Sequence, residues 1–193
     1  MQQKNNEFQG PAIVIPITKE LAEKNPFIYV EETEFGHYAM LLYLIIKSQR
    51  LETVVEMGIG EGYSTRFLLE AIKDFNGKVY SIDIEDKTNI KISKDNEKNW
   101  KFIQGNSAII GVGWKEPIDL IFIDGDHSYL SVLSDLAAWY QHVKKDGYIA
   151  MHDCTSNSEV EQAMNQFFKD KQVEKIVFPQ RHLSLAIIKK LED

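Results

Sequence analysis

The residues of this chain that are best suited to ligand chemistry lie in the segment VVEMGIGEGYST, residues 54–65. A run of apolar residues leads to Glu56, and Gly58, Gly60 and Gly62 follow at alternate positions. Glycines let the backbone of a turn approach a ligand closely, and the helical pattern that comes next places free N–H groups beside it. The segment is typical of a strand, a turn and a helix that together bind a nucleotide-like ligand.

The spacing of the glycines separates two kinds of nucleotide site. A dinucleotide fingerprint reads G-x-G-x-x-G, and its third glycine would fall at Tyr63. Glu56 would also repel a pyrophosphate, whereas it suits a ligand that carries positive charge. An NAD-dependent oxidoreductase is therefore disfavoured, and a positively charged ligand is favoured.

Polar or acidic side chains follow four further predicted strands, at the point where each strand ends. Ligands of open α/β sheets bind at the carboxyl ends of the strands. The residues concerned are Asp83, then Gly105, Asn106 and Ser107, then Asp124, Asp126, His127 and Tyr129, and finally His152 and Asp153. Asp126 and Asp153 could also serve simply as helix caps. Five strand ends that deliver polar groups to one crevice are hard to explain by caps alone.

The hydrophobic pattern alternates between strands and helices. Strands are predicted over 53–57, 78–84, 101–105, 118–124, 148–153, 174–179 and 183–190, and helices over 37–49, 64–75, 88–99, 130–143 and 159–170. Strands separated by helices predict a mainly parallel sheet with helices on both faces. The link between the last two strands is too short for a parallel crossover, so the last strand is expected to be antiparallel. The predicted fold is α/β, three-layer and doubly wound, with seven strands.

Length and composition bound the class of protein. The 193 residues suit one domain, predicted over 36–193, preceded over 1–35 by an arm or cap that contains a short helix at 18–25. A net charge of −7 argues against sequence-independent binding to DNA or RNA. The longest apolar run is too short to span a membrane, and the polar N-terminus and single cysteine favour a cytoplasmic location.

Three segments carry a resemblance to a known family. They are GHYAMLLYLIIKSQRLETVVEMGIGEGYSTRFLLEAI, then IDGDHSY, then GYIAMHDC. Residues 36–190 resemble the class I S-adenosylmethionine-dependent methyltransferases, which have a Rossmann-like fold. Within that class, IDGDHSY and the strand that ends in HDC resemble the metal-dependent O-methyltransferases of the catechol and macrolide-sugar types. The glycine turn is shared by the whole class.

The resemblance implies a role for each strand end. Glu56, the backbone of Gly58, Gly60 and Gly62, and Ser64 would line the methionine half of S-adenosylmethionine. Asp83 would accept the ribose hydroxyls, Ile84 would pack on the adenine, and Gly105, Asn106 and Ser107 would border its edge, with Asp124 also at the cofactor.

The resemblance also implies a metal site and a base. Asp124, His152 and Asp153 fall where the metal-dependent family places its ligands, and His127 falls where it places a general base. The chain departs from the family at His152, where an acidic residue is more usual. A site with an imidazole is softer than one of three oxygens, which weakens the case for magnesium and leaves manganese, iron or zinc. A site without metal stays open.

The expected acceptor is a hydroxyl of a small molecule. The arm, the loop after Asp153 and the turn at 180–182 would build its pocket, with Phe27, Tyr29, Phe35 and Trp114 as candidate walls. The protein is expected to bind neither nucleic acid nor a membrane, and it is expected to form a homodimer. The alternatives are a metal-independent methyltransferase, a relative of the hydroxylases that share this fold, and a non-catalytic cofactor-binding module.

Overall fold

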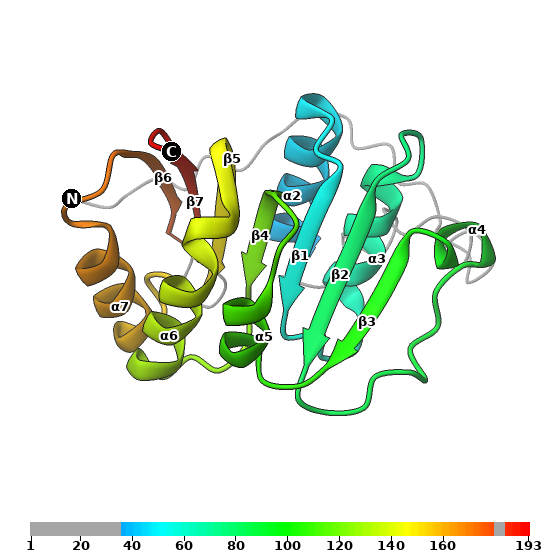
Figure 1. Cartoon of the computed structure of the whole chain (residues 1–193), viewed down its shortest axis with the longest axis horizontal. Helices are drawn as coiled ribbons and strands as arrows, with labels where there is room; N and C mark the ends of the chain where they lie inside the picture. Colours follow the sequence, from blue (N-terminus) through cyan, green and yellow to red (C-terminus); the bar gives the residue numbers. More distant parts are fainter. Residues whose placement is uncertain (1–35, 180–183) are drawn as a thin grey trace, which may run out of the picture.

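The computed structural model describes residues 36–179 and 184–193 of the chain. In this part a seven-stranded sheet carries helices on both faces (Figure 1). The strands are β1 Thr53–Met57, β2 Lys78–Asp83, β3 Trp100–Gln104, β4 Ile118–Ile123, β5 Val143–His152, β6 Val173–Phe178 and β7 Leu185–Lys190. The helices are α2 Gly36–Gln49, α3 Tyr63–Ile72, α4 Lys94–Glu97, α5 Ser107–Gly113, α6 Tyr129–Trp139 and α7 Ser158–Phe168, and a 3₁₀ turn, η2, covers Tyr140–His142.

The strand order is β3-β2-β1-β4-β5-β7-β6. The pairs among β1 to β5 are parallel, whereas β7 lies between β5 and β6 and is antiparallel to both. The predicted mainly parallel sheet with an antiparallel last strand is therefore confirmed. The order reverses between β1 and β4, and a crevice at such a switch point is where ligands of doubly wound sheets bind.

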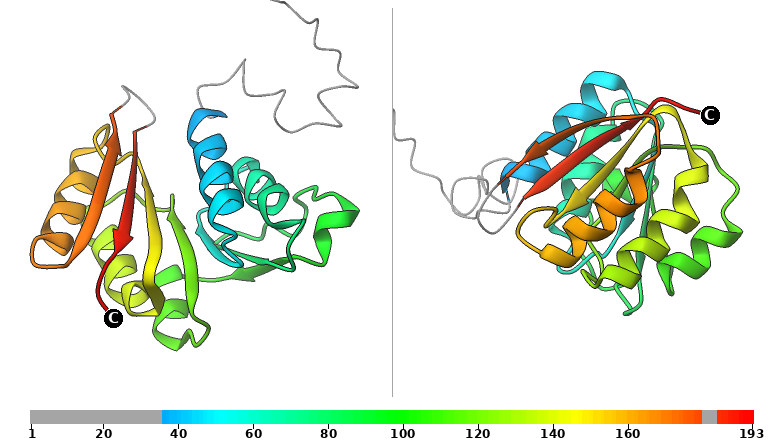
Figure 2. Two further views of the ribbon diagram at one scale, coloured as in Figure 1. Left: turned by 90° about the horizontal axis from the view of Figure 1, so that it is seen from above. Right: turned by 90° about the vertical axis from the view of Figure 1, so that its left-hand side faces the viewer.

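Alternate residues of the central strands point to opposite faces of the sheet and build two cores. Val54 and Leu120 pack with α2 and α3, and Val55 and Ile121 pack with α6 and α7. Figure 2 shows the corresponding layers, with α2 and α3 on one face and α5, α6 and α7 on the other. Strands covered on both faces explain why their sequences read as nearly continuous apolar runs.

Two helices differ from the sequence prediction. The helix predicted over 88–99 is only the four residues of α4, and the rest of that segment is irregular. Helix α5 was not predicted, because SAIIGVG contains two glycines, which are poor helix formers. Gly111 has a packing role, since a Cβ there would lie 2.5 Å from Nε1 of Trp139 on α6.

Two further expectations concern regions at the margins of the fold. The predicted arm over 1–35 and its helix at 18–25 lie outside the described residues. Within the described ranges, no helix combines the length and the apolar character needed to cross a membrane.

Candidate active site

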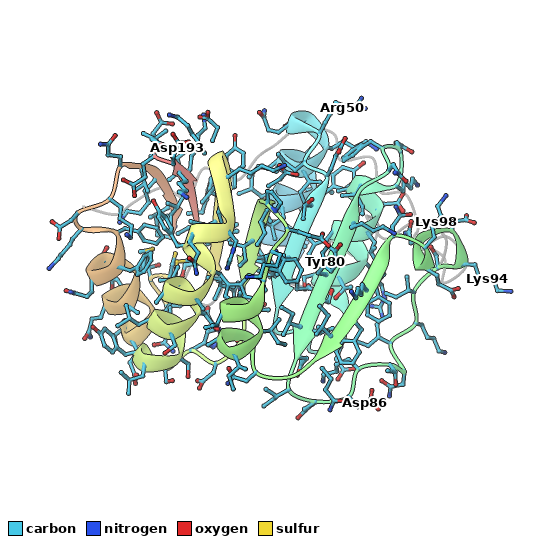
Figure 3. The ribbon with its side chains drawn as sticks, in the orientation of Figure 1. Arg50, Tyr80, Asp86, Lys94, Lys98 and Asp193 are labelled. Carbon is cyan, nitrogen blue, oxygen red and sulfur yellow. The ribbon has the colours of Figure 1, made fainter. Side chains whose placement is uncertain are left out.

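A cavity of about 770 Å³ opens at the carboxyl ends of β1, β2 and β4, between the loops that follow these strands and the starts of α5 and α6. In Figure 3, Asp86 marks this lower edge of the sheet and Arg50 marks the opposite one. Eight of the eleven residues predicted to bind the cofactor line the cavity: Gly58, Gly60, Asp83, Ile84, Gly105, Asn106, Ser107 and Asp124. The predicted residues Glu56, Gly62 and Ser64 are not among its lining residues.

Glu56 lies fully buried beneath the glycine turn. Its carboxylate accepts hydrogen bonds from the hydroxyls of Ser64 (2.5 Å), Thr65 (2.7 Å) and Ser81 (2.7 Å). Burial raises its pKa to about 7, although the three hydrogen bonds oppose the shift. Glu56 therefore ties β1 to β2 and to the first turn of α3, and Ser64 is one of its partners rather than part of the cavity wall.

The glycine turn needs its glycines for two different reasons. Gly58 and Gly60 both have positive φ angles, +81° and +52°, which favour glycine. A Cβ on Gly58 would lie 2.1 Å from the carbonyl oxygen of Asp124, so that position is closed by the neighbouring strand end. A Cβ on Gly60 would meet no atom within 4 Å among the described residues, so this stretch of backbone faces open space in the cavity.

Asp83 holds two loops together at the end of β2. Its Oδ2 accepts a hydrogen bond from the backbone N–H of Ile59, and its Oδ1 accepts one from that of Glu85. Each carboxylate oxygen retains a second lone pair. The side chain can thus fix the glycine turn and still accept hydroxyl groups of a ligand. Ile84 beside it is 70% exposed, an unusual degree for an isoleucine and consistent with a surface that a planar ligand would cover.

The α5 side of the cavity contains a buried acid that the sequence analysis missed. Asn106 caps α5 by accepting a hydrogen bond from the N–H of Ile109, and Ser107 donates to Oδ1 of Asp135 over 2.5 Å. Asp135 lies on α6, is 5% exposed and lines the cavity, and burial raises its pKa to about 6. Its position in the middle of a helix pattern gave no signal in the sequence.

Four side chains meet where β4 and β5 end, next to the cavity. Oδ1 of Asp124 lies 3.0 Å from Nδ1 of His152 and 3.5 Å from Nε2 of His127. Oδ2 of Asp153 lies 3.5 Å and 3.8 Å from the same two nitrogens. We call Asp124, His127, His152 and Asp153 the histidine–carboxylate cluster. Asp124 belongs both to this cluster and to the cavity wall.

The charges of the cluster act on one another. Burial alone would raise the pKa of Asp124, but His127 and His152 hold it below its usual range. The Asp124 carboxylate in turn raises the pKa of His127. His127 therefore holds a proton more readily than a free imidazole does.

Neighbouring groups hold the cluster in place. Asp153 has a left-handed backbone (φ +53°), which aspartate tolerates better than most residues, and its Oδ1 accepts a hydrogen bond from Ser156. Buried Ser184, next to β7, accepts hydrogen bonds from the N–H groups of Thr155 and Ser156. On the other side the ring of Tyr38, from α2, packs 4.6 Å from that of His152.

The cluster fits a divalent metal ion. Nε2 of His152 is buried without a hydrogen-bond partner in the described part of the chain. Nδ1 of His152 and Nε2 of His127 are buried against carboxylate oxygens without regular hydrogen-bond geometry. One ligand atom each from Asp124, His127 and His152 lies within 4.8 Å of the other two. The family resemblance predicted Asp124, His152 and Asp153 as ligands and His127 as a base. The structure places His127 within the group of possible ligands and brings Asp153 close to both histidines.

The predicted acceptor pocket is described only in part. The arm with Phe27, Tyr29 and Phe35, and the turn at 180–182, lie outside the described residues. Trp114 does not wall this site, because its ring packs against Tyr80 (4.9 Å) and Trp139 (5.1 Å) in the core on the α6 side of the sheet.

Comparisons with known proteins agree with the geometry. A family model described as a methyltransferase domain matches residues 55–154, just over half of the chain. An uncharacterized protein of Acanthamoeba polyphaga mimivirus, R132, is 29% identical over 167 residues, which cover 76% of each chain. The chain therefore belongs to the class I S-adenosylmethionine-dependent methyltransferases.

Solved structures share the fold. The SAH-bound methyltransferase PaMTH1 of Podospora anserina superimposes with a TM-score of 0.67 at 11% identity, covering 94% of this chain and 100% of that one. An O-methyltransferase of Bacillus cereus in complex with SAH has a TM-score of 0.64 at 18% identity, covering 92% and 93%. The expected Rossmann-like methyltransferase fold is thus confirmed, and S-adenosylmethionine is the cofactor of the class.

Proposed function

We propose that the protein is an O-methyltransferase that transfers the methyl group of S-adenosylmethionine to a hydroxyl group of a small molecule, assisted by a divalent metal ion. The observation that carries the proposal is the position of Asp124, which belongs to the cofactor cavity and to the histidine–carboxylate cluster at once. A methyl donor in the cavity and an acceptor oxygen at the cluster would therefore lie next to each other.

The charge of the cavity supports a cationic cofactor. Five acidic side chains line it, namely Asp83, Glu85, Asp124, Asp126 and Asp135. Lys87 is the one basic side chain in this lining, and its Nζ pairs with Glu85 at 2.9 Å. The surplus of negative charge favours the sulfonium of S-adenosylmethionine and disfavours the pyrophosphate of NAD.

The transfer is an in-line displacement. The acceptor O–H gives up its proton to solvent, a new O–C bond forms to the methyl carbon, the S–C bond breaks, and its electron pair stays on sulfur as a neutral thioether. Alignment of the oxygen, carbon and sulfur supplies much of the rate, and the glycine turn, Asp83 and Asn106 are placed to hold the donor.

Proton loss from the acceptor is assigned to the cluster. A divalent cation, when bound, supplies a Lewis acid that lowers the pKa of a hydroxyl group. Asp124, His127 and His152 would hold it, with Asp153 beside both histidines. The acceptor oxygen would lie next to this group, which the ring of Tyr38 covers on one side.

The proposal is tested by binding and by turnover on the full-length protein. Calorimetry is expected to show binding of S-adenosylmethionine and no comparable binding of NAD. A panel of hydroxylated acceptors, assayed with metal and after chelation, is expected to contain one that is methylated on oxygen and only with metal. Equal binding of NAD would overturn the cofactor assignment. Binding without turnover on any acceptor would favour the non-catalytic module, and turnover that survives chelation would favour the metal-independent alternative.

A further inference from the structure

We propose that His127 and His152 are both metal ligands, and that with Asp124 and Asp153 they form a centre that selects a transition metal such as zinc or iron(II) over magnesium. The inference rests on the proposed function in that a divalent cation is expected at this cluster. The inference goes beyond the proposed function because it names the class of metal and gives His127 the role of a ligand instead of a base.

The ring nitrogens carry the first argument. His152 is 5% exposed, and its Nε2 has no hydrogen-bond partner in the described ranges. Its Nδ1 and Nε2 of His127 face the carboxylates of the cluster at 3.0–3.8 Å without regular hydrogen-bond geometry. Leaving a buried polar atom unpaired costs about 1–3 kcal/mol, so native proteins rarely do so without a reason. A cation among these atoms would use Nε2 of His127 and Nδ1 of His152 as donors and would also offset the repulsion between two neighbouring carboxylates.

The distances carry the second argument. Ligands bound to one ion at about 2.1 Å lie roughly 3.0–3.4 Å apart along the edge of an octahedron or a tetrahedron. The four nitrogen–oxygen distances in the cluster, 3.0, 3.5, 3.5 and 3.8 Å, lie at or slightly above that range. Because the ligand atoms of Asp124, His127 and His152 lie within 4.8 Å of one another, small rotations of these side chains would bring them to one ion. Asp153 lies beside both histidines and is the further candidate ligand.

The types of donor atom determine which metals the cluster favours. Magnesium prefers an octahedron of oxygen ligands and binds imidazole poorly, whereas zinc and iron(II) take imidazole nitrogen readily. Two imidazoles and one or two carboxylates are a donor set of the zinc and non-haem iron kind, with room for a further ligand. The acceptor oxygen of the proposed methyl transfer would fill that open position.

Hydrogen bonds around the cluster orient its ligands. Ser156 fixes the oxygen of Asp153 that points away from the histidines, and Ser184 fixes the loop in which Ser156 lies. Loss of such outer contacts lowers metal affinity by about 10–100-fold in known sites. The cluster is held on the ends of two adjacent core strands, which gives it a rigid base.

The test is a metal titration of the full-length protein after chelation, with Co²⁺ as the spectroscopic probe. We expect one Co²⁺ per chain with visible absorption bands, displacement by equimolar Zn²⁺, and no displacement by a hundredfold excess of Mg²⁺. His127→Ala and His152→Ala are each expected to weaken Co²⁺ binding by at least about tenfold. His142→Ala is the matched control, because His142 lies outside the cluster and contacts the carbonyl oxygen of Gly111.

The outcomes separate this inference from the proposed function. Mg²⁺ that displaces Co²⁺ readily, or a folded His127→Ala protein that keeps the wild-type Co²⁺ spectrum and affinity, would overturn it. In the latter case a loss of turnover alone would restore His127 as a general base. Binding of S-adenosylmethionine is measured on the same metal-free preparation. If that binding fails while Co²⁺ binds as expected, the methyltransferase proposal is wrong and the metal centre stands.

Discussion

Glu56 shows how one buried charge can serve the fold and the site together. The carboxylate lies under the turn that faces the cofactor cavity and accepts hydrogen bonds from three hydroxyls. Because burial raises its pKa from 4.5 to about 7, the protonated form is the one that the folded state favours relative to the unfolded chain. Its contribution to stability is therefore full below about pH 4.5 and is lost as the pH rises through 7.

Replacement of this carboxylate tests that account. The difference in free energy of unfolding between Glu56→Gln and the wild type should shift in favour of the variant as the pH rises from 4.5 to 8, by up to roughly 3 kcal/mol. Denaturant unfolding across that range measures it. Glu52→Gln, at an exposed position just before β1, is the control and should show no such trend. A pH-independent difference for Glu56→Gln would mean that the carboxylate is ionised throughout.

Asp83 is the residue on which cofactor affinity is expected to depend most directly. Its carboxylate lines the cavity and fixes Ile59 and Glu85, so Asp83→Ala removes both a ligand contact and the support of two loops. Affinity for S-adenosylmethionine, measured by calorimetry, should fall by about 1–3 kcal/mol. Asp86→Ala is the matched control, since that exposed carboxylate binds only within its own turn. Equal affinity in the two variants would remove Asp83 from the site.

At the scale of elements, two glycines of the β1–α3 turn are needed for different reasons, one for packing and one for ligand access. Gly58→Ala should destabilise the fold, because the new methyl group would overlap the carbonyl oxygen of Asp124, which directly follows the neighbouring strand β4. Gly60→Ala should cost about 1–2 kcal/mol for its positive φ and leave the packing intact. Its methyl group would project into the cavity, so affinity for S-adenosylmethionine should fall by at least tenfold.

Melting and calorimetry on the same preparations separate the two effects. We expect a large fall in melting temperature for Gly58→Ala, and for Gly60→Ala a small fall in melting temperature with a large loss of affinity. Gly113→Ala is a suitable control, because a Cβ at this position at the end of α5 meets nothing within 4 Å among the described residues. A Gly60→Ala protein with wild-type affinity would show that the cofactor does not pass over the turn.

The helices and strands could be predicted from the sequence where the spacing of their apolar residues is regular. The seven strands lie within a few residues of their predicted bounds, because short apolar runs that alternate with amphipathic helices are typical of buried parallel strands. The exception is β5, which begins at Val143 rather than 148, since KKDG reads as a loop. Helix α5 was missed for a different reason: its Gly111 is needed for close packing on Trp139, which no local pattern reveals.

The site was predictable only as far as strand ends determine it. The strand-end residues of the sequence placed Asp83, Asp124 and His152 at one edge of the sheet. They did not show that Glu56 lies beneath the cavity wall instead of in it, because its burial depends on hydrogen bonds from three hydroxyls at separate positions in the chain. They also could not show that His127 lies beside Asp153, because that contact depends on the pairing of β4 with β5 and on the path of two loops.

At the scale of the whole molecule, the cavity joins parts of the fold that are far apart in the chain. Its walls come from the ends of β1, β2 and β4 and from the starts of α5 and α6, so a ligand there contacts both halves of the sheet. A ligand that binds only the folded state stabilises it by mass action, about 2.7 kcal/mol at a concentration one hundred times Kd. Thermal unfolding of the whole chain therefore reports on the cofactor.

We expect S-adenosylmethionine at that concentration to raise the melting temperature by about 5–10 °C, since 1 kcal/mol corresponds to roughly 2–4 °C for a domain of this size. NAD at equal concentration should leave it unchanged, because the acidic cavity repels a pyrophosphate. Gly60→Ala should lose about half of the shift or more at the same cofactor concentration, because a tenfold weaker affinity reduces the stabilisation to about 1.4 kcal/mol. Its own melting temperature without cofactor should fall by a few degrees only. A similar shift with NAD, or an undiminished shift in Gly60→Ala, would show that the stabilising ligand binds somewhere other than the cavity at the β1 turn.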